Sequence, residues 1–185
     1  RRNRKADGLF GSSEGLGPRE LRELYDRNFT MLFRVAWRIV GDEGSAEDIV
    51  HDSFARLVEK RIPFPSPDDA KFWLIRVVKN NALNVAKRRG REARAYERYW
   101  RESREESESA EAVAIKAEAG AEVQAMLARL PEKLRAVLVL KEYALLSYRE
   151  IGRVLGITEG NVKVRVFRAR EALLSLMTED GHGAS

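Results

Sequence analysis

The chain has 185 residues, of which 44% are hydrophobic and 34% are charged, and its formal net charge is +5 at pH 7. This length fits one or two globular domains, and the positive charge favours a polyanionic partner. The chain has no cysteine, which excludes disulfides and thiolate metal sites, and its two histidines leave little for other metal binding. We expect neither a metal nor a cofactor. No apolar run approaches the roughly 20 residues of a membrane span and no secretory pattern is present, so we expect a soluble cytoplasmic protein.

The first 17 residues combine arginine, lysine, glycine and serine without periodicity, which is typical of a flexible tail. Such a tail can touch DNA or stay solvated, and the sequence favours the solvated state. Because residue 1 is Arg rather than Met, we expect the chain to be truncated or processed. A second short tail is expected over residues 179–185.

The segment from Pro18 to Gly41 repeats apolar residues at helical spacing and predicts a first helix. The pattern restarts at Ser45, which stands three residues before Asp48 in a weak form of the capping box. Apolar residues then recur from position 46 to position 58, so this second helix is strongly amphipathic. Its outer face carries four polar residues, Asp48, His51, Asp52 and Arg56. Periodicity alone indicates a solvated face.

A proline-rich loop over residues 62–67 separates this helix from a third one, expected from about Asp69 to Arg89. Three amides, Asn80, Asn81 and Asn84, are poor choices for a helix interior, so their clustering favours a use in binding. Basic and aromatic residues surround them. This combination is typical of nucleic-acid contact, where cations neutralise phosphates, amides bond base edges and aromatic rings stack on unpaired bases.

Beyond this helix the composition changes. Residues 96–118 are rich in glutamate and serine and have faint apolar periodicity, which predicts a mobile acidic linker over residues 94–120. After it, apolar stripes predict further helices, one of which starts at Pro131. No strand pattern and no internal repeat occurs. The sequence therefore predicts an all-α fold with two small helical domains, residues 18–93 and 121–178, joined by a flexible linker.

The segment from Ser147 to Arg170 predicts two short helices joined by a tight turn. Ser147 and Glu150 have the spacing of a capping box, Gly156 ends the first helix, and Thr158 caps the second. Gly152 fits the place where two helices cross closely. The second helix turns apolar residues to one side and cationic and amide residues to the other, as in a helix-turn-helix that enters the major groove. The plainer alternative is a helical hairpin with a solvated charged face.

This segment resembles the DNA-reading end of the extracytoplasmic-function group of bacterial sigma factors, whose pattern is roughly L-S-Y-x-E-I-A, a small turn, then G-T-V-K-S-R-L-x-R-A-R. Here Leu146–Gly152 and Gly160–Arg170 match it, with Gly152, Asn161, Val164 and Val166 as departures. Val164 places an apolar group where the family usually has a hydroxyl. The resemblance implies minus-thirty-five reading by Arg149, Asn161, Lys163, Val164, Arg165, Phe167 and Arg168.

The resemblance continues upstream. Residues 46–54 look like A-E-D-L-V-Q-E-x-F, the family's helix that docks on the largest polymerase subunit, which implies that Asp48, His51, Asp52 and Arg56 bind core RNA polymerase. His51 replaces the usual Gln. Residues 73–89 resemble W-L-x-x-I-A-x-N-x-x-x-D-x-x-R-R, with Asn84 in place of Asp. This segment implies that the melted minus-ten element is held by Trp73, Arg76, Lys79, Asn80, Asn81, Asn84, Lys87 and Arg88, although core packing also accounts for much of the Trp73 ring.

Two functions remain open at this point. A sigma factor would join core RNA polymerase and promoter DNA, and the family implies an anti-sigma factor as a further partner. A stand-alone helix-turn-helix regulator would need only the C-terminal helices and would leave the amide-rich helix unexplained. We do not expect an enzyme, because no Ser/His/Asp set, glycine-rich phosphate loop or metal-ligand spacing is visible.

Overall fold

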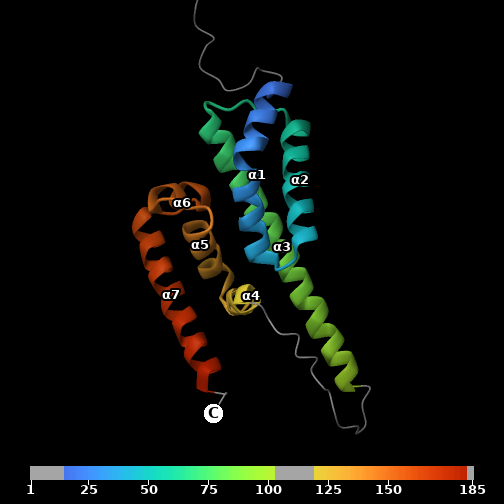
Figure 1. The fold of residues 1–185 in the computed structure, drawn as a ribbon, viewed down its shortest axis with the longest axis vertical. Helices are drawn as coiled ribbons and strands as arrows, with labels where there is room; N and C mark the ends of the chain where they lie inside the picture. The colour runs from blue at the N-terminus through green and yellow to red at the C-terminus, as the bar shows by residue number, and fades with distance from the viewer. Residues whose placement is uncertain (1–14, 103–118, 183–185) are drawn as a thin grey trace, which may run out of the picture.

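The computed structural model describes residues 15–102 and 119–182, and within these ranges the regular structure is helical (Figure 1). The seven helices are α1 (Pro18–Val40), α2 (Glu43–Lys60), α3 (Pro67–Glu102), α4 (Ala119–Arg129), α5 (Glu132–Glu142), α6 (Tyr148–Leu155) and α7 (Glu159–His182). The expected all-α fold is confirmed. None of these helices is both long enough and apolar enough to cross a membrane.

Helices α1, α2 and α3 pack lengthwise into one bundle, whose core contains Leu32, Val50 and Leu74, each fully buried. Gly41 ends α1 in the left-handed conformation, with φ of 76°, as its position in the sequence predicts. The start of α2 differs from the expectation. Asp42, not Ser45, caps the helix, because its carboxylate accepts the backbone N–H of Ser45 at 2.8 Å.

The third helix is longer than expected. Its predicted end near Arg89 is wrong, because α3 continues as one helix to Glu102 and includes residues 94–102 of the expected linker. The extension has no apolar stripe, which hides it from a periodicity argument. Its alanine, arginine and glutamate residues are strong helix formers, and the Arg88–Glu92 pair at 3.8 Å supports the helix locally. Residues 103–118, the rest of the expected linker, lie outside the described part.

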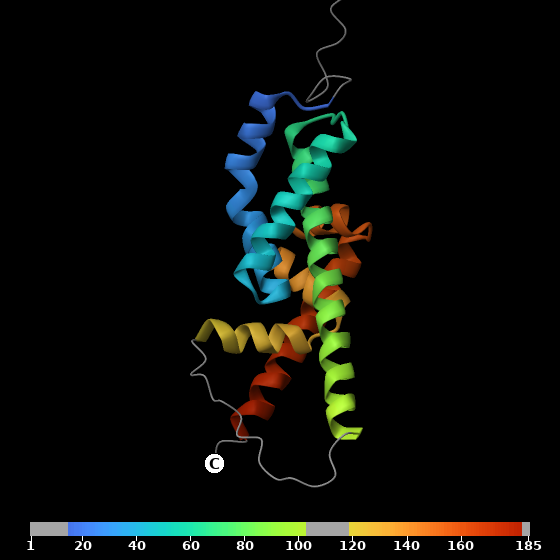
Figure 2. The same cartoon turned by 90° about the vertical axis from the view of Figure 1, so that its right-hand side faces the viewer.

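Helices α4 to α7 form the second bundle, in which residues 136–140 of α5 are buried and α7 packs along α5. The two bundles contact each other through α1 with α4 and α5, and through α3 with α6. Figure 2 shows α4 crossing the molecule at a steep angle to α3. The expected N-terminal tail falls mostly on residues outside the described ranges, but Gly15 and Leu16 are packed against the first bundle.

Candidate nucleic-acid interface

The turn between α6 and α7 is built by local signals. The Ser147 hydroxyl accepts the backbone N–H of Glu150 at 3.3 Å, and the Glu150 carboxylate accepts the backbone N–H of Ser147 at 2.7 Å, which completes the predicted capping box. The Ser147 hydroxyl also donates to the Glu150 carboxylate at 2.7 Å, and this bond, with that from the Ser147 backbone N–H, holds the pKa of Glu150 below its usual range. Gly156 ends α6 with φ of 68°. A Cβ on Gly152 would lie 2.6 Å from the carbonyl oxygen of Ile157, so glycine permits this close approach.

Helix α7 separates an inner from an outer face as predicted. Thr158 accepts the backbone N–H of Asn161 at 3.2 Å and caps the helix. Val162, Val166 and Ala169 are buried against the domain core. Of the residues expected to read DNA, one is partly buried, Arg165, and the others are exposed: Arg149, Asn161, Lys163, Val164, Phe167 and Arg168. Phe167, with 62% of its surface exposed, is a large apolar side chain facing solvent.

The cations on α7 differ in their partners. Lys163 pairs with Glu159 at 3.0 Å, and Arg170 donates a hydrogen bond to Glu142 at 2.7 Å, which raises the pKa of Arg170. Arg168 makes no such bond with any residue in the described ranges. Its guanidinium is exposed on the outer face of α7 and is not held by a carboxylate of the described residues.

On α3, the amide cluster divides by exposure. Asn80 and Asn84 face solvent with Lys87 and Arg88, while Asn81 is partly buried. Trp73 is half-buried and packs edge-on against Phe64, with ring centroids 6.2 Å apart. Core packing thus accounts for part of the Trp73 ring, as expected.

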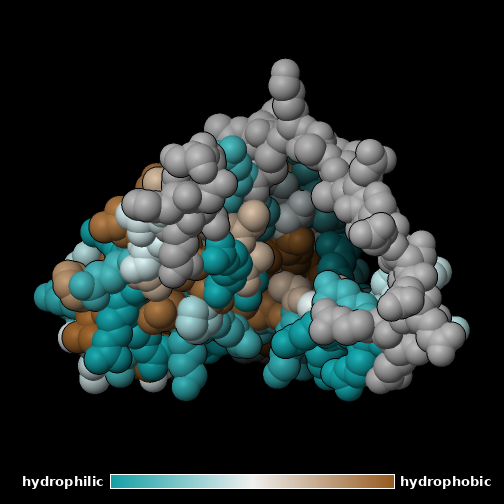
Figure 3. All heavy atoms as spheres, turned by 90° about the horizontal axis from the view of Figure 1, so that it is seen from below, coloured by the Kyte–Doolittle hydropathy of each residue, from teal (hydrophilic) through white to brown (hydrophobic). Residues whose placement is uncertain are grey.

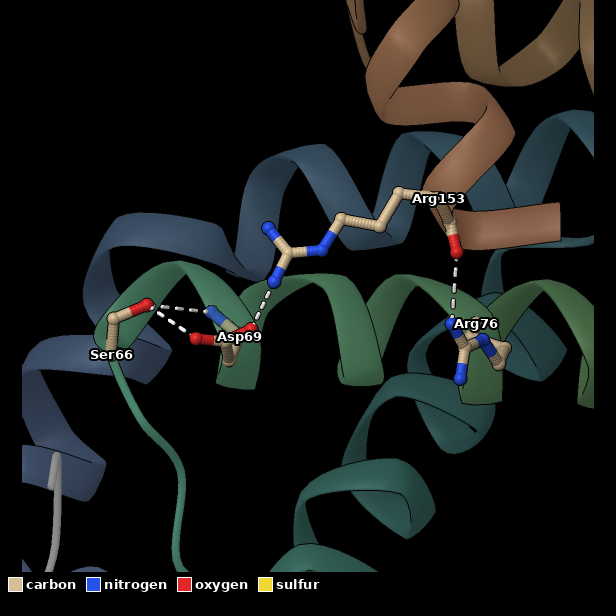
Figure 4. A network of polar contacts seen from close by, with 4 residues as sticks. All are labelled: Ser66, Asp69, Arg76 and Arg153. Atoms are coloured by element: carbon tan, nitrogen blue, oxygen red, sulfur yellow. Dashed lines mark hydrogen bonds and ion pairs between the residues drawn. The ribbon is translucent and has the colours of Figure 1, made fainter. Parts of the chain in front are cut away.

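Arg76 is exposed, but its guanidinium is already engaged by the C-terminal domain. Its guanidinium donates hydrogen bonds to two carbonyls at the end of α6. One is that of Val154, at 3.0 Å, and the other is that of Arg153, at 2.9 Å, which Figure 4 shows. Arg153 in turn forms an ion pair with Asp69 on α3 and lies over the ring of Phe72, 4.8 Å from its centroid. We call these contacts of Asp69, Phe72 and Arg76 with Arg153 and Val154 the α3–α6 contact. It joins the two expected DNA-binding segments to each other.

Lys79 lies beside the same interface. It is partly buried, and desolvation lowers its pKa, with Glu132 of α5 opposing this shift and Arg76 adding to it. Arg76 is thus bound to the C-terminal domain, and Lys79 lies close to it. Both are among the eight residues expected at the minus-ten element.

The outer face of α2 presents its four expected residues, Asp48, His51, Asp52 and Arg56, to solvent. His51 does not stand alone, because its Nε2 lies 3.1 Å from the hydroxyl of Tyr25 on α1. The His51 ring also stacks on Phe29, with centroids 5.7 Å apart. Tyr25 and Phe29 were not expected at this face. Both are half-buried, and their i, i+4 spacing on α1 is the sequence signal that they share one side of the helix.

A groove of about 900 Å³ lies between the bundles, lined by α1, α3, α4 and α5. Trp37, Leu83 and Ala86 give it an apolar lining, while Arg94 and Arg135 lie at its sides. Seen from below, the molecule has a recess with apolar surface at its base and hydrophilic surface around it (Figure 3). Within the described ranges, no group of three or more His, Asp or Glu residues is placed to hold a metal ion.

Two family profiles match the chain in the order that the fold suggests. Sigma-70 region 2 matches residues 24–92, which form the first bundle and the start of the α3 extension, and Sigma-70, region 4 matches residues 120–173. Among solved structures, CnrH in complex with the cytosolic domain of CnrY aligns with a TM-score of 0.65 at 22% identity, covering 89% of this chain and 91% of that one. The sigma factor RpoE from Bartonella quintana, in complex with the anti-sigma factor NepR, aligns with a TM-score of 0.58 at 22% identity, covering 85% and 98%.

Relatives identified by sequence are sigma factors as well. The ECF RNA polymerase sigma factor SigE of Mycolicibacterium smegmatis is 33% identical over 82% of this chain, which spans 59% of that relative's length. The RNA polymerase sigma-H factor of Pseudomonas aeruginosa is 32% identical over 74% of this chain and 75% of its own length. With both sigma-70 regions present in order, each on its own helical bundle, the chain belongs to the extracytoplasmic-function group of the sigma-70 family.

Proposed function

We propose that this protein is the promoter-specificity subunit of a bacterial RNA polymerase: it binds the core enzyme in the cytoplasm and directs initiation at its own promoters. The observation that carries the proposal is the presence of both sigma-70 regions on one chain. Each region has exposed basic and amide side chains of the kind that contact DNA. A stand-alone regulator is not favoured. It would use α6 and α7 and leave the exposed amides of α3 and the polar face of α2 without a role.

We assign the contact with core RNA polymerase to α2. Asp48 and Asp52 are exposed, lie one turn apart and project away from the buried stripe of Ile49, Ser53 and Phe54, so they can meet a basic partner without disturbing the fold. His51 extends this face toward Tyr25 and Phe29 on α1. The proposed docking surface therefore includes an aromatic side from α1 as well as the acidic side from α2.

DNA contacts are divided between the two bundles. Exposed Asn80 and Asn84 suit the base edges of a melted minus-ten strand, with Lys87 and Arg88 on its phosphates. Arg168, Asn161 and Lys163 suit the major groove of the minus-thirty-five duplex, where arginine bonds guanine and asparagine bonds adenine. Val164 suits contact with a thymine methyl group.

The α3–α6 contact has a consequence for this mechanism. A strand held by Arg76 needs the guanidinium that now bonds to the carbonyls of Arg153 and Val154. The bundles must therefore separate at α3–α6 before Arg76 can bind promoter DNA. We infer that polymerase binding supplies this separation, because a polymerase-bound chain must span two promoter elements.

We also propose an anti-sigma factor as a partner, since the similar RpoE structure is a complex of that kind. The protein is expected to contribute binding and no covalent step, so we assign no catalytic residue. The test of the function is transcription in vitro with core RNA polymerase on a library of promoter fragments. A sigma factor makes the core enzyme initiate at one promoter sequence, whereas a stand-alone regulator binds DNA without starting transcription or co-purifying with the core enzyme.

A further inference from the structure

The last third of α3 extends past α1 and α2, to about the level of the far end of α7 (Figures 1 and 2). Every residue from Arg91 to Trp100 is exposed to solvent. The segment therefore contributes nothing to either hydrophobic core, and its side chains need another explanation.

Three of these side chains are aromatic. Tyr96, Tyr99 and Trp100 have 64%, 67% and 48% of their surface exposed, and the rings of Tyr96 and Trp100 lie 5.8 Å apart. Large aromatic rings that stay exposed among the described residues are the kind of apolar surface that marks a binding site. Their flat faces are available for stacking.

Arginines lie on the same stretch of α3. The spacing puts Tyr99 beside their row and Tyr96 and Trp100 on the opposite side of the helix. Arg91, Arg94 and Arg98 repeat at i, i+3 and i+7 and, with Tyr99, line a shallow hollow of about 450 Å³ on the helix surface. Spacing of three and four residues keeps side chains on one helix face. Counted back from Arg91, the same spacing reaches Lys87, Asn84 and Asn80, all exposed. The proposed minus-ten face of α3 thus continues without interruption into the arginines of the extension.

We propose that residues 91–100 of α3 bind single-stranded DNA as a continuation of the minus-ten surface. Arg91, Arg94 and Arg98 contact phosphates, while Tyr96, Tyr99 and Trp100 stack on unpaired bases. With a rise of 1.5 Å per residue, the distance from Asn84 to Trp100 is about 24 Å. A strand with its bases stacked at about 3.4 Å per nucleotide would cover this length in about seven nucleotides.

The exposed rings favour single-stranded DNA over duplex DNA or an acidic protein segment as the ligand. Duplex DNA keeps its base faces stacked inside the helix, so it would use the arginines and leave all three rings in water. An acidic protein segment would likewise pair with the arginines alone. A single strand that crosses the helix from the arginine row to the opposite side would use both groups.

The test measures binding of the full chain, without polymerase, to a fluorescein-labelled oligo-dT strand and to a duplex of the same length. One variant, Tyr96→Leu/Tyr99→Leu/Trp100→Leu, removes the rings but keeps good helix formers. A second, Arg91→Ala/Arg94→Ala/Arg98→Ala, removes the charges. The matched control, Arg19→Ala/Arg22→Ala/Arg27→Ala, removes three exposed arginines from α1.

We expect the leucine variant to bind oligo-dT about tenfold or more weakly with unchanged duplex affinity, since each stacked base contributes that much in single-strand complexes. The alanine variant should lose affinity for both probes and lower the salt slope for the single strand by about two units. The α1 control should lose much less affinity for oligo-dT. Quenching of tryptophan fluorescence by oligo-dT should fall in Trp100→Phe, which leaves Trp37 and Trp73 in place.

Two outcomes overturn the proposal. One is a leucine variant that binds oligo-dT as the wild type does, or that loses duplex binding equally. The other is a concentration-dependent dimer that the leucine variant dissociates, which would assign the rings to a second copy of the chain. Because the assay contains no polymerase, either result leaves the promoter-specificity function to its own test.

Discussion

The guanidinium of Arg76 on α3 donates a hydrogen bond, 3.0 Å long, to the carbonyl of Val154 at the end of α6, 78 residues later in the chain. Arg76 belongs to the segment proposed to hold the minus-ten strand, and Val154 belongs to the helix-turn-helix proposed to read the minus-thirty-five duplex. The same contact contains the Arg153–Asp69 ion pair. Two segments that we propose to bind DNA are thus hydrogen-bonded and ion-paired to each other.

Weakening this contact should separate the bundles. Asp69→Ala removes the partner of Arg153, and we expect the two domains to spend more time apart while each stays folded. The chain has no cysteine, so dyes can be attached at Glu23→Cys and Leu174→Cys, both exposed, and the distance between them followed by energy transfer. The neighbouring Asp68→Ala is the control. Identical transfer efficiency in Asp69→Ala and wild type would show that the ion pair does not hold the domains together.

The polymerase-docking face gives a second expectation. Asp48→Arg/Asp52→Arg should abolish co-purification with core RNA polymerase, because two exposed carboxylates become cations on the proposed contact. Since both are exposed, the free energy of unfolding should change by no more than about 0.5 kcal/mol. Glu122→Arg/Glu171→Arg makes the same charge change on the C-terminal domain and serves as the control. A double mutant that still co-purifies at wild-type level would rule out this face.

The amides of α3 are expected to act on the melted strand. Asn80→Ala and Asn84→Ala should each slow promoter opening more than they weaken the closed complex, because they bond base edges that are available after melting. The measurement compares initiation from a duplex promoter with initiation from one carrying a pre-melted bubble. Partly buried Asn81 offers a comparison position. If the bubble fails to rescue either variant, the amides have a structural role instead.

Arg168 should discriminate between bases. A bidentate contact with guanine contributes roughly 1–3 kcal/mol, or about tenfold to a hundredfold in preference, so Arg168→Ala should relax selectivity at one position of the minus-thirty-five element. Val164→Ser should shift base preference with little loss of stability, since Val164 is exposed. Both variants are measured on a randomised duplex library at two salt concentrations. A uniform loss across the library, with a salt slope about one unit smaller, would assign Arg168 to a phosphate.

The capping box should make the C-terminal domain sensitive to acid. The pKa of Glu150 is lowered by its hydrogen bonds with Ser147, so the folded state holds this proton less tightly than the unfolded state. Its contribution is present above the ordinary glutamate pKa near 4.5 and is lost as pH falls through the lower folded value. Ser147→Ala should destabilise the domain by about 1 kcal/mol.

The check is the thermal unfolding midpoint of wild type and Glu150→Gln followed from neutral pH to pH 3. The difference between them should be largest at neutral pH and shrink in acid, because protonated Glu150 resembles glutamine. Asp68→Asn, an exposed carboxylate on the other domain, controls for general charge effects. A constant difference over the whole range would show that ionisation of Glu150 contributes nothing.

The helix-turn-helix shows how far the sequence alone could lead. Its caps, its stop at Gly156 and its buried stripe all depend on residues within four positions of each other, so short-range spacing predicted them correctly. The start of α2 was predicted less well, because two good capping residues, Asp42 and Ser45, compete within one turn, and Asp42 is the cap. The far end of α3 was missed because helix propensity without an apolar stripe leaves no periodic signal.

The sequence by itself therefore determined the helical class, the two family regions and the inward-facing residues of α7, since each rests on local periodicity. Only the tertiary structure decided which polar residues of α3 remain available. Asn80 and Asn84 stay exposed, whereas Arg76 is held by carbonyls 77 and 78 positions away and Lys79 lies near Glu132. The physical reason is that a cation satisfies whichever oxygen the fold brings within hydrogen-bond distance, and spacing along one helix contains no information about the distant segment that supplies it.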